Sequence, residues 1–172
     1  MRTSDCDNFT VPGLTNSGPE HWQTRWEGRL STARRVEQDD WDWPGREGWI
    51  ARIVEEVALA ERQMVLIAHS LGVVAVAHAA AALPPDRVRG AFLVAPPDVE
   101  SPDKVPAIVR PFAPLPRDPL PFPSLLVASR TDPHCAYERA EEIACAWGSA
   151  LIDAGDAGHL NTASGHGPGP RA

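Results

Sequence analysis

The sequence MVLIAHSLG at residues 64–72 passes from an apolar run to a serine and then directly into a second apolar segment. Residues 64–68 are typical of a buried β-strand, because they are apolar, partly β-branched and too few for a helix. Residues 71–83 are rich in alanine and nearly apolar on all sides, which predicts a helix buried against a sheet. Ser70 is therefore predicted to lie at a sharp strand-to-helix turn with almost no loop.

Similar apolar runs alternate with helical patterns along the rest of the chain. Strands are predicted at residues 8–11, 35–37, 64–68, 88–95, 124–129 and 150–152. Helices are predicted at residues 22–30, 49–60, 71–83 and 136–147. Ser17 and Glu20 are predicted to form a capping box ahead of the first helix. This alternation predicts an α/β fold, a three-layer α/β/α sandwich around a mostly parallel sheet of about six strands.

Composition bounds the number of domains and the classes of partner. A chain of 172 residues with 43% hydrophobic residues is predicted to form one domain. The formal charge of −7 argues against nucleic acid or an anionic membrane as a partner, since both require clustered positive charge. The sequence shows no apolar run long enough to span a membrane and no signal-peptide pattern, so a cytoplasmic location is predicted.

Two segments interrupt the alternation. Ten of the 18 prolines lie within residues 96–123, which predicts a long loop that acts as a lid over a site or as a binding loop. The glycine- and proline-rich residues 164–172 are predicted to be a poorly ordered tail. The rest of the chain divides into a polar segment at residues 1–10, to which no structure is assigned, and a folded domain at residues 11–163. The predicted elements use up this domain and leave no room for an inserted cap domain.

The strand–serine–helix turn has the pattern of the nucleophile elbow of α/β-hydrolases. Ala68 occupies the position where the first glycine of that motif usually stands, and Gly72 occupies the position of the second. The alternative is that Ser70 only caps the helix that begins at Leu71. As a nucleophile, a serine hydroxyl needs a histidine to take its proton and an acid to orient that histidine.

The chain order serine, acid, histidine that is typical of this fold selects the partners of Ser70. Asp132 follows one predicted strand directly, and His159 follows the next, so both are expected at the sheet edge where Ser70 lies. Asp132 could instead cap the helix that comes after it. Asp153 and Asp156 are the alternative acids.

An oxyanion hole needs two fixed backbone donors. The backbone N–H of Leu71 is one candidate, because it lies at a helix N-terminus directly after the serine. Leu14, in the loop after the first strand, is the other, although this loop could be an ordinary glycine-rich connection. The proline-rich segment offers four candidate walls for a substrate pocket, which could equally belong to the core: Ile108, Phe112, Leu115 and Phe122.

The remaining histidines and cysteines do not indicate a bound metal. His69 precedes the serine, and its side chain is expected on the opposite side of the strand. No H-E-x-x-H or comparable spacing is present, and no C-x-x-C pair occurs among the three cysteines. No G-x-G-x-x-G follows a strand either, so neither a metal nor a cofactor is predicted.

Several blocks of sequence, in the same order, resemble the bacterial form of the retinoblastoma-binding protein 9 family of small serine hydrolases. The blocks are VPG at 11–13, NSGPEHW at 16–22, AHSLG at 68–72, LVAPPD at 93–98, ASRTDP at 128–133 and GHLN at 158–161. The resemblance implies an α/β-hydrolase fold without a cap, in which Ser70, Asp132 and His159 cleave a small ester or amide without a cofactor. Some members of this family are also described through protein partners.

Two features depart from that family. Residues 1–10 are polar where an apolar first strand is expected, and the sequence shows no closing helix after His159. The alternative hypothesis is therefore a catalytically weak or inactive hydrolase-fold protein that acts as a binding module.

Overall fold

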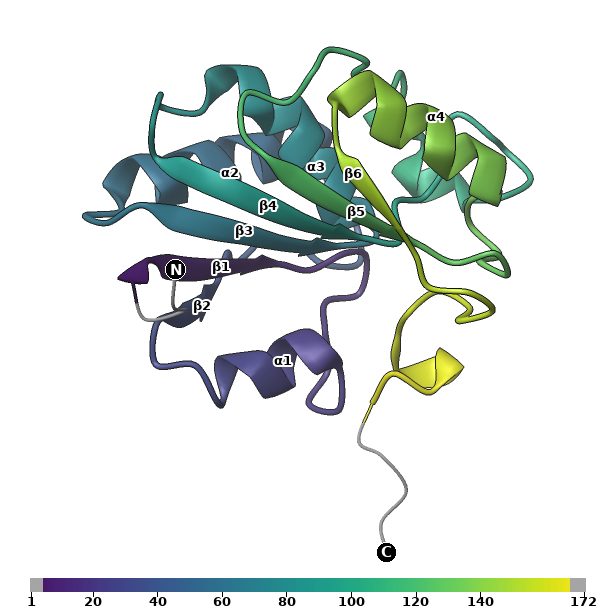
Figure 1. Cartoon of the computed structure of the whole chain (residues 1–172), viewed down its shortest axis with the longest axis horizontal. Coiled ribbons are helices and arrows are strands. Elements are labelled where there is room, and N and C mark those ends of the chain that lie inside the picture. Colours follow the sequence, from purple (N-terminus) through teal and green to yellow (C-terminus); the bar gives the residue numbers. More distant parts are fainter. Residues whose placement is uncertain (1–4, 168–172) are drawn as a thin grey trace, which may run out of the picture.

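The computed structural model describes residues 5–167 and has a six-stranded sheet at its centre (Figure 1). The strand order is β2-β1-β3-β4-β5-β6, and all neighbouring strands are parallel. The strands are β1 (Asp7–Val11), β2 (Ala33–Arg35), β3 (Met64–His69), β4 (Val88–Val94), β5 (Ser124–Ala128) and β6 (Ala150–Asp153). All six predicted strands are present, and the sheet is fully parallel.

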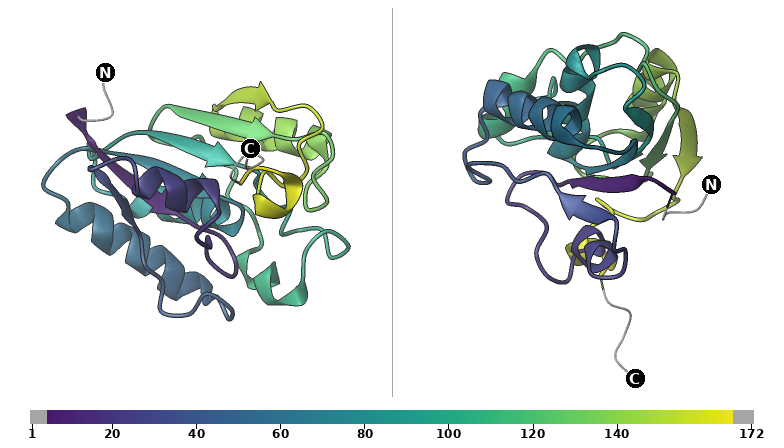
Figure 2. Two further views of the ribbon diagram at one scale, coloured as in Figure 1. Left: turned by 90° about the horizontal axis from the view of Figure 1, so that it is seen from below. Right: turned by 90° about the vertical axis from the view of Figure 1, so that its left-hand side faces the viewer.

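Helices lie on both faces of this sheet. The three longer helices, α2 (Arg46–Leu59), α3 (Leu71–Ala79) and α4 (Tyr137–Trp147), cover one face. The short α1 (Trp22–Glu27) and the 3₁₀-helix η4 (Thr162–Ser164) lie on the other face (Figures 1 and 2). The predicted three-layer α/β architecture without a cap domain is confirmed. Among residues 5–167, no helix is both long and apolar enough to cross a membrane.

The core lies between the sheet and the three longer helices. Helix α3 is apolar on every side and buried along its length except at His78, because it packs between the sheet, α2 and the proline-rich segment. Helix α2 presents Trp49, Ile53 and Val57 to the same core. The helix predicted at residues 71–83 ends at Ala79 and continues as the 3₁₀-helix η2 (Ala80–Ala82).

The polar residues before Val11 form a sound first strand. Strand β1 begins at Asp7 and is paired on both sides, so the boundary placed at residue 11 falls inside the sheet. Asn8 and Thr10 are buried yet satisfied: the Asn8 amide donates to Thr32 Oγ1 at 2.8 Å, and the Thr10 hydroxyl donates to the Glu27 carboxylate. Residues 1–4 of the predicted polar segment lie outside the described residues.

The capping box predicted ahead of the first helix is wrong. Helix α1 begins at Trp22, and its N-cap is His21, whose Nδ1 accepts from the backbone N–H of Gln23. Ser17 donates instead to the Gln23 side chain at 2.7 Å, because this chain turns once more before the helix starts. The same glutamine donates to the Ile67 carbonyl at 2.9 Å, so it links α1 to β3.

The face of the sheet beside α1 is only partly covered. On β5 and β6, Leu125 and Ile152 are 43% and 40% exposed. No α-helix follows β6 within the described chain; η4 alone does, and the predicted tail is described only as far as residue 167.

Candidate active site

Ser70 stands at a backbone turn that few residues other than glycine adopt. Its φ is 54° and its ψ is −127°, between the end of β3 and the first turn of α3. Its side chain makes no cap hydrogen bond to the helix, so the alternative in which Ser70 only caps α3 has no support in the geometry. The turn holds the hydroxyl above the carboxyl ends of the strands.

Two glycines allow other backbone segments to approach this turn. A β-carbon at Gly72 would overlap the carbonyl oxygen of Val11, so α3 and the end of β1 are in direct contact. A β-carbon at Gly13 would lie 2.8 Å from Ser70 Cβ and 3.0 Å from the Leu71 nitrogen. The strand β1, its following loop and the serine turn are therefore packed backbone to backbone.

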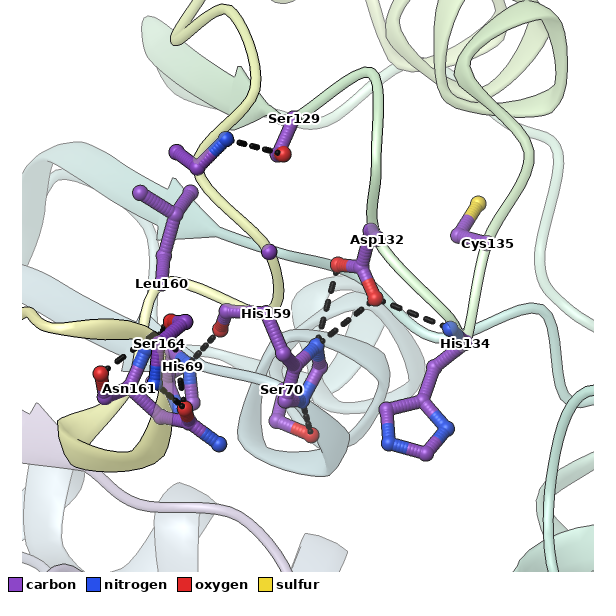
Figure 3. A network of polar contacts seen from close by, with 12 residues as sticks. His69, Ser70, Ser129, Asp132, His134, Cys135, His159, Leu160, Asn161 and Ser164 are labelled. Carbon is purple, nitrogen blue, oxygen red and sulfur yellow. Dashed lines mark hydrogen bonds and ion pairs between the residues drawn. The ribbon is translucent and has the colours of Figure 1, made fainter.

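Ser70, His159 and Asp132 form a continuous hydrogen-bonded chain (Figure 3). The Ser70 hydroxyl lies 2.8 Å from His159 Nε2. His159 Nδ1 lies 2.9 and 3.0 Å from the two carboxylate oxygens of Asp132. Asp132 and His159 are both buried, and the backbone N–H of His134 donates to Asp132 at 2.9 Å, which fixes the carboxylate.

The alternative acids lie elsewhere. Asp153 accepts hydrogen bonds from the Arg130 guanidinium at 2.6 and 2.9 Å and from the Gly155 backbone at 2.8 Å. The Arg130 hydrogen bonds and charge, together with this backbone bond, hold the pKa of Asp153 below its ordinary value. Asp156 is exposed. Of the three aspartates considered, the structure brings only Asp132 to His159.

The loop after β1 presents backbone donors beside the serine. Among the described residues, no hydrogen bond is recorded for the backbone N–H of Leu14 or of Leu71, the latter being at the first position of α3. The loop is held by its neighbours: Thr15 N–H donates to the Trp41 carbonyl at 2.9 Å, and Arg35 donates to the Asn16 side chain at 2.8 Å. Both expected oxyanion donors thus lie at the Gly13–Ser70 contact.

His69 has a role that its position in the sequence does not reveal. Its Nε2 lies 2.9 Å from the carbonyl oxygen of His159, on the same side as the site and contrary to the expectation that it faces away. Burial, together with the charges of neighbouring histidines, lowers the pKa of His69 to about 3. Trp22 Nε1 donates to the next carbonyl, that of Leu160, at 3.0 Å. Two consecutive carbonyls of the His159 loop are therefore held by side chains.

A further histidine packs on each side of this group. The ring of His21 contacts that of His69 at 4.8 Å between centroids, and burial, Arg35 and His159 lower the pKa of His21 to about 4. The ring of His134 lies 4.5 Å from that of His159, edge to face. His21 and His69 are therefore neutral near pH 7, so they add no positive charge beside His159.

Two cavities open beside Ser70, and they differ in character. One, of about 290 Å³, has polar and apolar surface in similar amounts and is the more polar of the two; its walls include Thr15, Asn16, His21, His69, Asn161 and Thr162. The other, of about 230 Å³, is largely apolar, and its walls include Leu71, Pro97, Val105, Pro106, Val109 and His134. Five residues border both cavities: Leu14, Thr15, Ser70, His159 and Asn161.

None of the four predicted pocket residues lines either cavity. Phe112 and Leu115 are buried in the core, and Ile108 packs against it, while Phe122 borders a separate hollow near Leu83. The reason is the course of η3 (Ala107–Phe112), which packs Phe112 edge to face on Trp49 at 5.9 Å between centroids. Val109, on the same short helix, borders the cavity instead.

The parallel sheet, the serine turn and the residues gathered at the strand ends define an α/β-hydrolase. The chain belongs to the serine hydrolase family, whose model matches residues 8–172. The protein is therefore a hydrolase of the α/β-hydrolase superfamily.

Solved structures of similar proteins agree with this class. A protein described as a YdeN-like hydrolase from Pectobacterium atrosepticum is 33% identical, with 96% of this chain and 85% of that chain covered and a TM-score of 0.83. The ydeN gene product of B. subtilis is 18% identical, with 93% and 90% covered and a TM-score of 0.75, which shows the fold alone. No curated protein matches the chain.

Proposed function

We propose that the protein cleaves a small ester or amide through an acyl-enzyme intermediate, with Ser70 as nucleophile, His159 as base and Asp132 as the orienting acid. The observation that carries this proposal is the unbroken path from Ser70 Oγ to His159 Nε2 at 2.8 Å and from His159 Nδ1 to Asp132 at 2.9 Å. The closer kinship to the retinoblastoma-binding protein 9 family belongs to the same proposal.

The hydrogen bonds define the direction of proton transfer. Asp132 can only accept when ionised, so His159 carries its proton on Nδ1 and offers the lone pair of Nε2 to the Ser70 hydroxyl. As Ser70 Oγ bonds to the substrate carbonyl carbon, its proton moves to His159. His159 then gives that proton to the leaving alcohol or amine as the C–O or C–N bond breaks. A water molecule attacks the acyl group by the same route and frees Ser70.

The oxyanion of the tetrahedral intermediate would accept from the backbone N–H groups of Leu71 and Leu14. Both groups lie beside Ser70 and keep their places while charge develops, because the Gly13 and Gly72 contacts fix the two segments. A single such donor is typically worth about 10²- to 10³-fold in turnover.

One of the two observations that motivate the rival hypothesis, an inactive binding module, no longer favours it. It rests partly on a first strand too polar to hold the oxyanion loop, but β1 is paired on both sides and its buried polar side chains have partners. The cavities at Ser70, of about 290 and 230 Å³, have room for a small substrate.

A fluorophosphonate probe tests the proposal directly, because it reacts with an activated serine whatever the natural substrate is. Wild-type protein is expected to become labelled at Ser70, whereas Ser70→Ala is not, and His159→Gln is labelled at least about a hundredfold more slowly. Equal labelling of wild type and Ser70→Ala would refute the proposal. Labelling without turnover of any ester or amide in a broad panel would favour the binding module.

A further inference from the structure

The two cavities at Ser70 would place the two halves of a substrate in different surroundings. The wall of one cavity is rich in hydroxyl, amide and imidazole groups, and that of the other is mostly aliphatic and proline. Ser70 and His159 belong to both walls, so a carbonyl carbon attacked by Ser70 would have one cavity on each side. Such a site can sort the acyl group of a substrate from its leaving group by polarity.

The charges of the side chains around the two cavities narrow the class of substrate further. Within the described chain, no Asp, Glu, Lys or Arg borders either cavity. His21 and His69, which border the more polar cavity, are neutral near pH 7 because their pKa values are lowered to about 4 and about 3. A substrate charge placed in either cavity would lose part of its hydration without gaining an ionic partner, which disfavours its binding. Both halves of a good substrate should therefore be uncharged.

We propose that the substrate is an uncharged ester or amide with a short apolar acyl chain and a hydrogen-bonding leaving group. This inference rests on the proposed function. The acyl chain occupies the apolar cavity bounded by Leu71, Val105 and Val109, and the leaving group occupies the more polar cavity bounded by Asn16, His21 and Thr162. At roughly 30 Å³ for each small group, a cavity of about 230 Å³ holds a chain of up to about seven carbons.

The direction follows from the chemistry of the two halves. The departing alcohol or amine accepts a proton from His159, and its own polar groups must be satisfied until it leaves, which the hydroxyl and amide groups of Thr162 and Asn161 can do. The acyl group stays bound through a second step. An aliphatic wall holds it without competing hydrogen bonds, and β-branched Val105 and Val109 have few rotamers to rearrange.

Matched substrates test the acyl half. Pentanoyl and 4-aminobutanoyl esters of one alcohol have acyl chains of the same length and differ in a terminal methyl or ammonium group; a succinyl ester places a carboxylate there. We expect kcat/KM for the pentanoyl ester to exceed both charged analogues by about a hundredfold or more. Similar values for the three esters would overturn the inference.

The leaving-group half is tested with 2-hydroxyethyl and propyl esters of the same acid, which differ only in a terminal hydroxyl or methyl. The 2-hydroxyethyl ester is expected to be favoured by about three- to tenfold. Preference for the propyl ester would contradict the inference.

Two variants decide which cavity holds which half. Val109→Phe should lower kcat/KM for pentanoyl relative to acetyl esters by at least about tenfold and leave the preference for 2-hydroxyethyl unchanged. Thr162→Val should abolish that preference and leave the acyl-chain profile unchanged. The opposite pattern would overturn the assignment. If Val109→Phe does not fold, Val109→Ala, which enlarges the same cavity, should move the optimum to longer acyl chains; an unmoved optimum would overturn the assignment too.

Fluorophosphonate labelling separates this inference from the proposed function. A protein that labels at Ser70 but ignores the charge of the acyl chain is a serine hydrolase with a different substrate class. A protein that does not label at Ser70 loses the proposed function itself.

Discussion

The imidazole Nε2 of His69 lies 2.9 Å from the backbone carbonyl oxygen of His159, and the two rings lie 5.0 Å apart between centroids. A carbonyl oxygen only accepts, so His69 carries its proton on Nε2 and donates it. With a pKa lowered to about 3, His69 stays neutral at the pH where hydrolysis runs. The residue directly before Ser70 thus fixes the loop that carries His159, the proposed base.

This contact predicts unequal effects of two substitutions at His69. His69→Leu removes the donor, frees the His159 loop, and should lower kcat by about ten- to a hundredfold, since small displacements of a catalytic group are costly. His69→Gln places an amide N–H within reach of the same carbonyl and should retain most of the activity. Steady-state kinetics on one ester, with circular dichroism to confirm folding, checks this. Equal losses in the two variants would show that the hydrogen bond does not matter.

The low pKa of His69 also predicts how stability depends on pH. The unfolded chain takes up a proton at this residue below pH 6.5, whereas the folded protein does so only near pH 3. The free energy of unfolding should therefore fall as the pH drops from 6.5 toward 3, by about 1.4 kcal/mol per pH unit from this residue. His21, with a pKa lowered to about 4, acts in the same direction. Urea unfolding at several pH values should show a shallower decline for His69→Gln, and an unchanged decline would contradict this account.

The backbone of Ser70 predicts a trade between stability and activity. A φ of 54° with a ψ of −127° strains any residue that has a β-carbon. Ser70→Gly should unfold at a higher urea concentration than Ser70→Ala, with a gain of about 1 kcal/mol, and both variants should be inactive. Equal midpoints for the two would mean that the turn stores no strain.

Asp132 is predicted to be the acid that the reaction needs. Asp132→Asn keeps the shape of the side chain but can no longer hold His159 in the productive tautomer, so kcat should fall by up to about 10⁴-fold. Asp153→Asn is the matched control, because it disrupts only the exposed hydrogen bonds with Arg130 and Gly155, and it should stay within a few-fold of wild type. A loss below tenfold in folded Asp132→Asn would transfer the role to another acid.

Much of this architecture could be predicted from local sequence pattern. Apolar runs located the central strands β3, β4 and β5, because strands covered on both faces of a parallel sheet are largely apolar; β2 (Ala33–Arg35) lies two residues before its predicted position. The Ser70 turn was recognisable because a strand, a serine and an apolar helix leave no residues for a loop. The order of Ser70, Asp132 and His159 then placed all three at one sheet edge, and the structure brings them within hydrogen-bonding distance.

The errors arose where long-range contacts decide. Asn8 and Thr10 made the first strand look weak, yet Thr32 and Glu27, distant in the sequence, satisfy them. For the large apolar residues of the proline-rich segment, the sequence leaves pocket wall and core equally open; large side chains gain most from burial, and Phe112 packs in the core beside Trp49. The smaller Val109, on the same 3₁₀-helix, borders the apolar cavity instead.

The close packing of Gly72 against Val11, and of Gly13 against Ser70, has a consequence for how substrates enter. Neither the serine turn nor the loop after β1 can shift alone, because each would collide with the other. Any adaptation to substrates of different size must come from the opposite wall, where Val105 and Val109 belong to the proline-rich segment, which between its ends is held by helices rather than by strand pairing. The rate of product release, and how it changes with viscosity or temperature, should therefore report on the proline-rich segment alone.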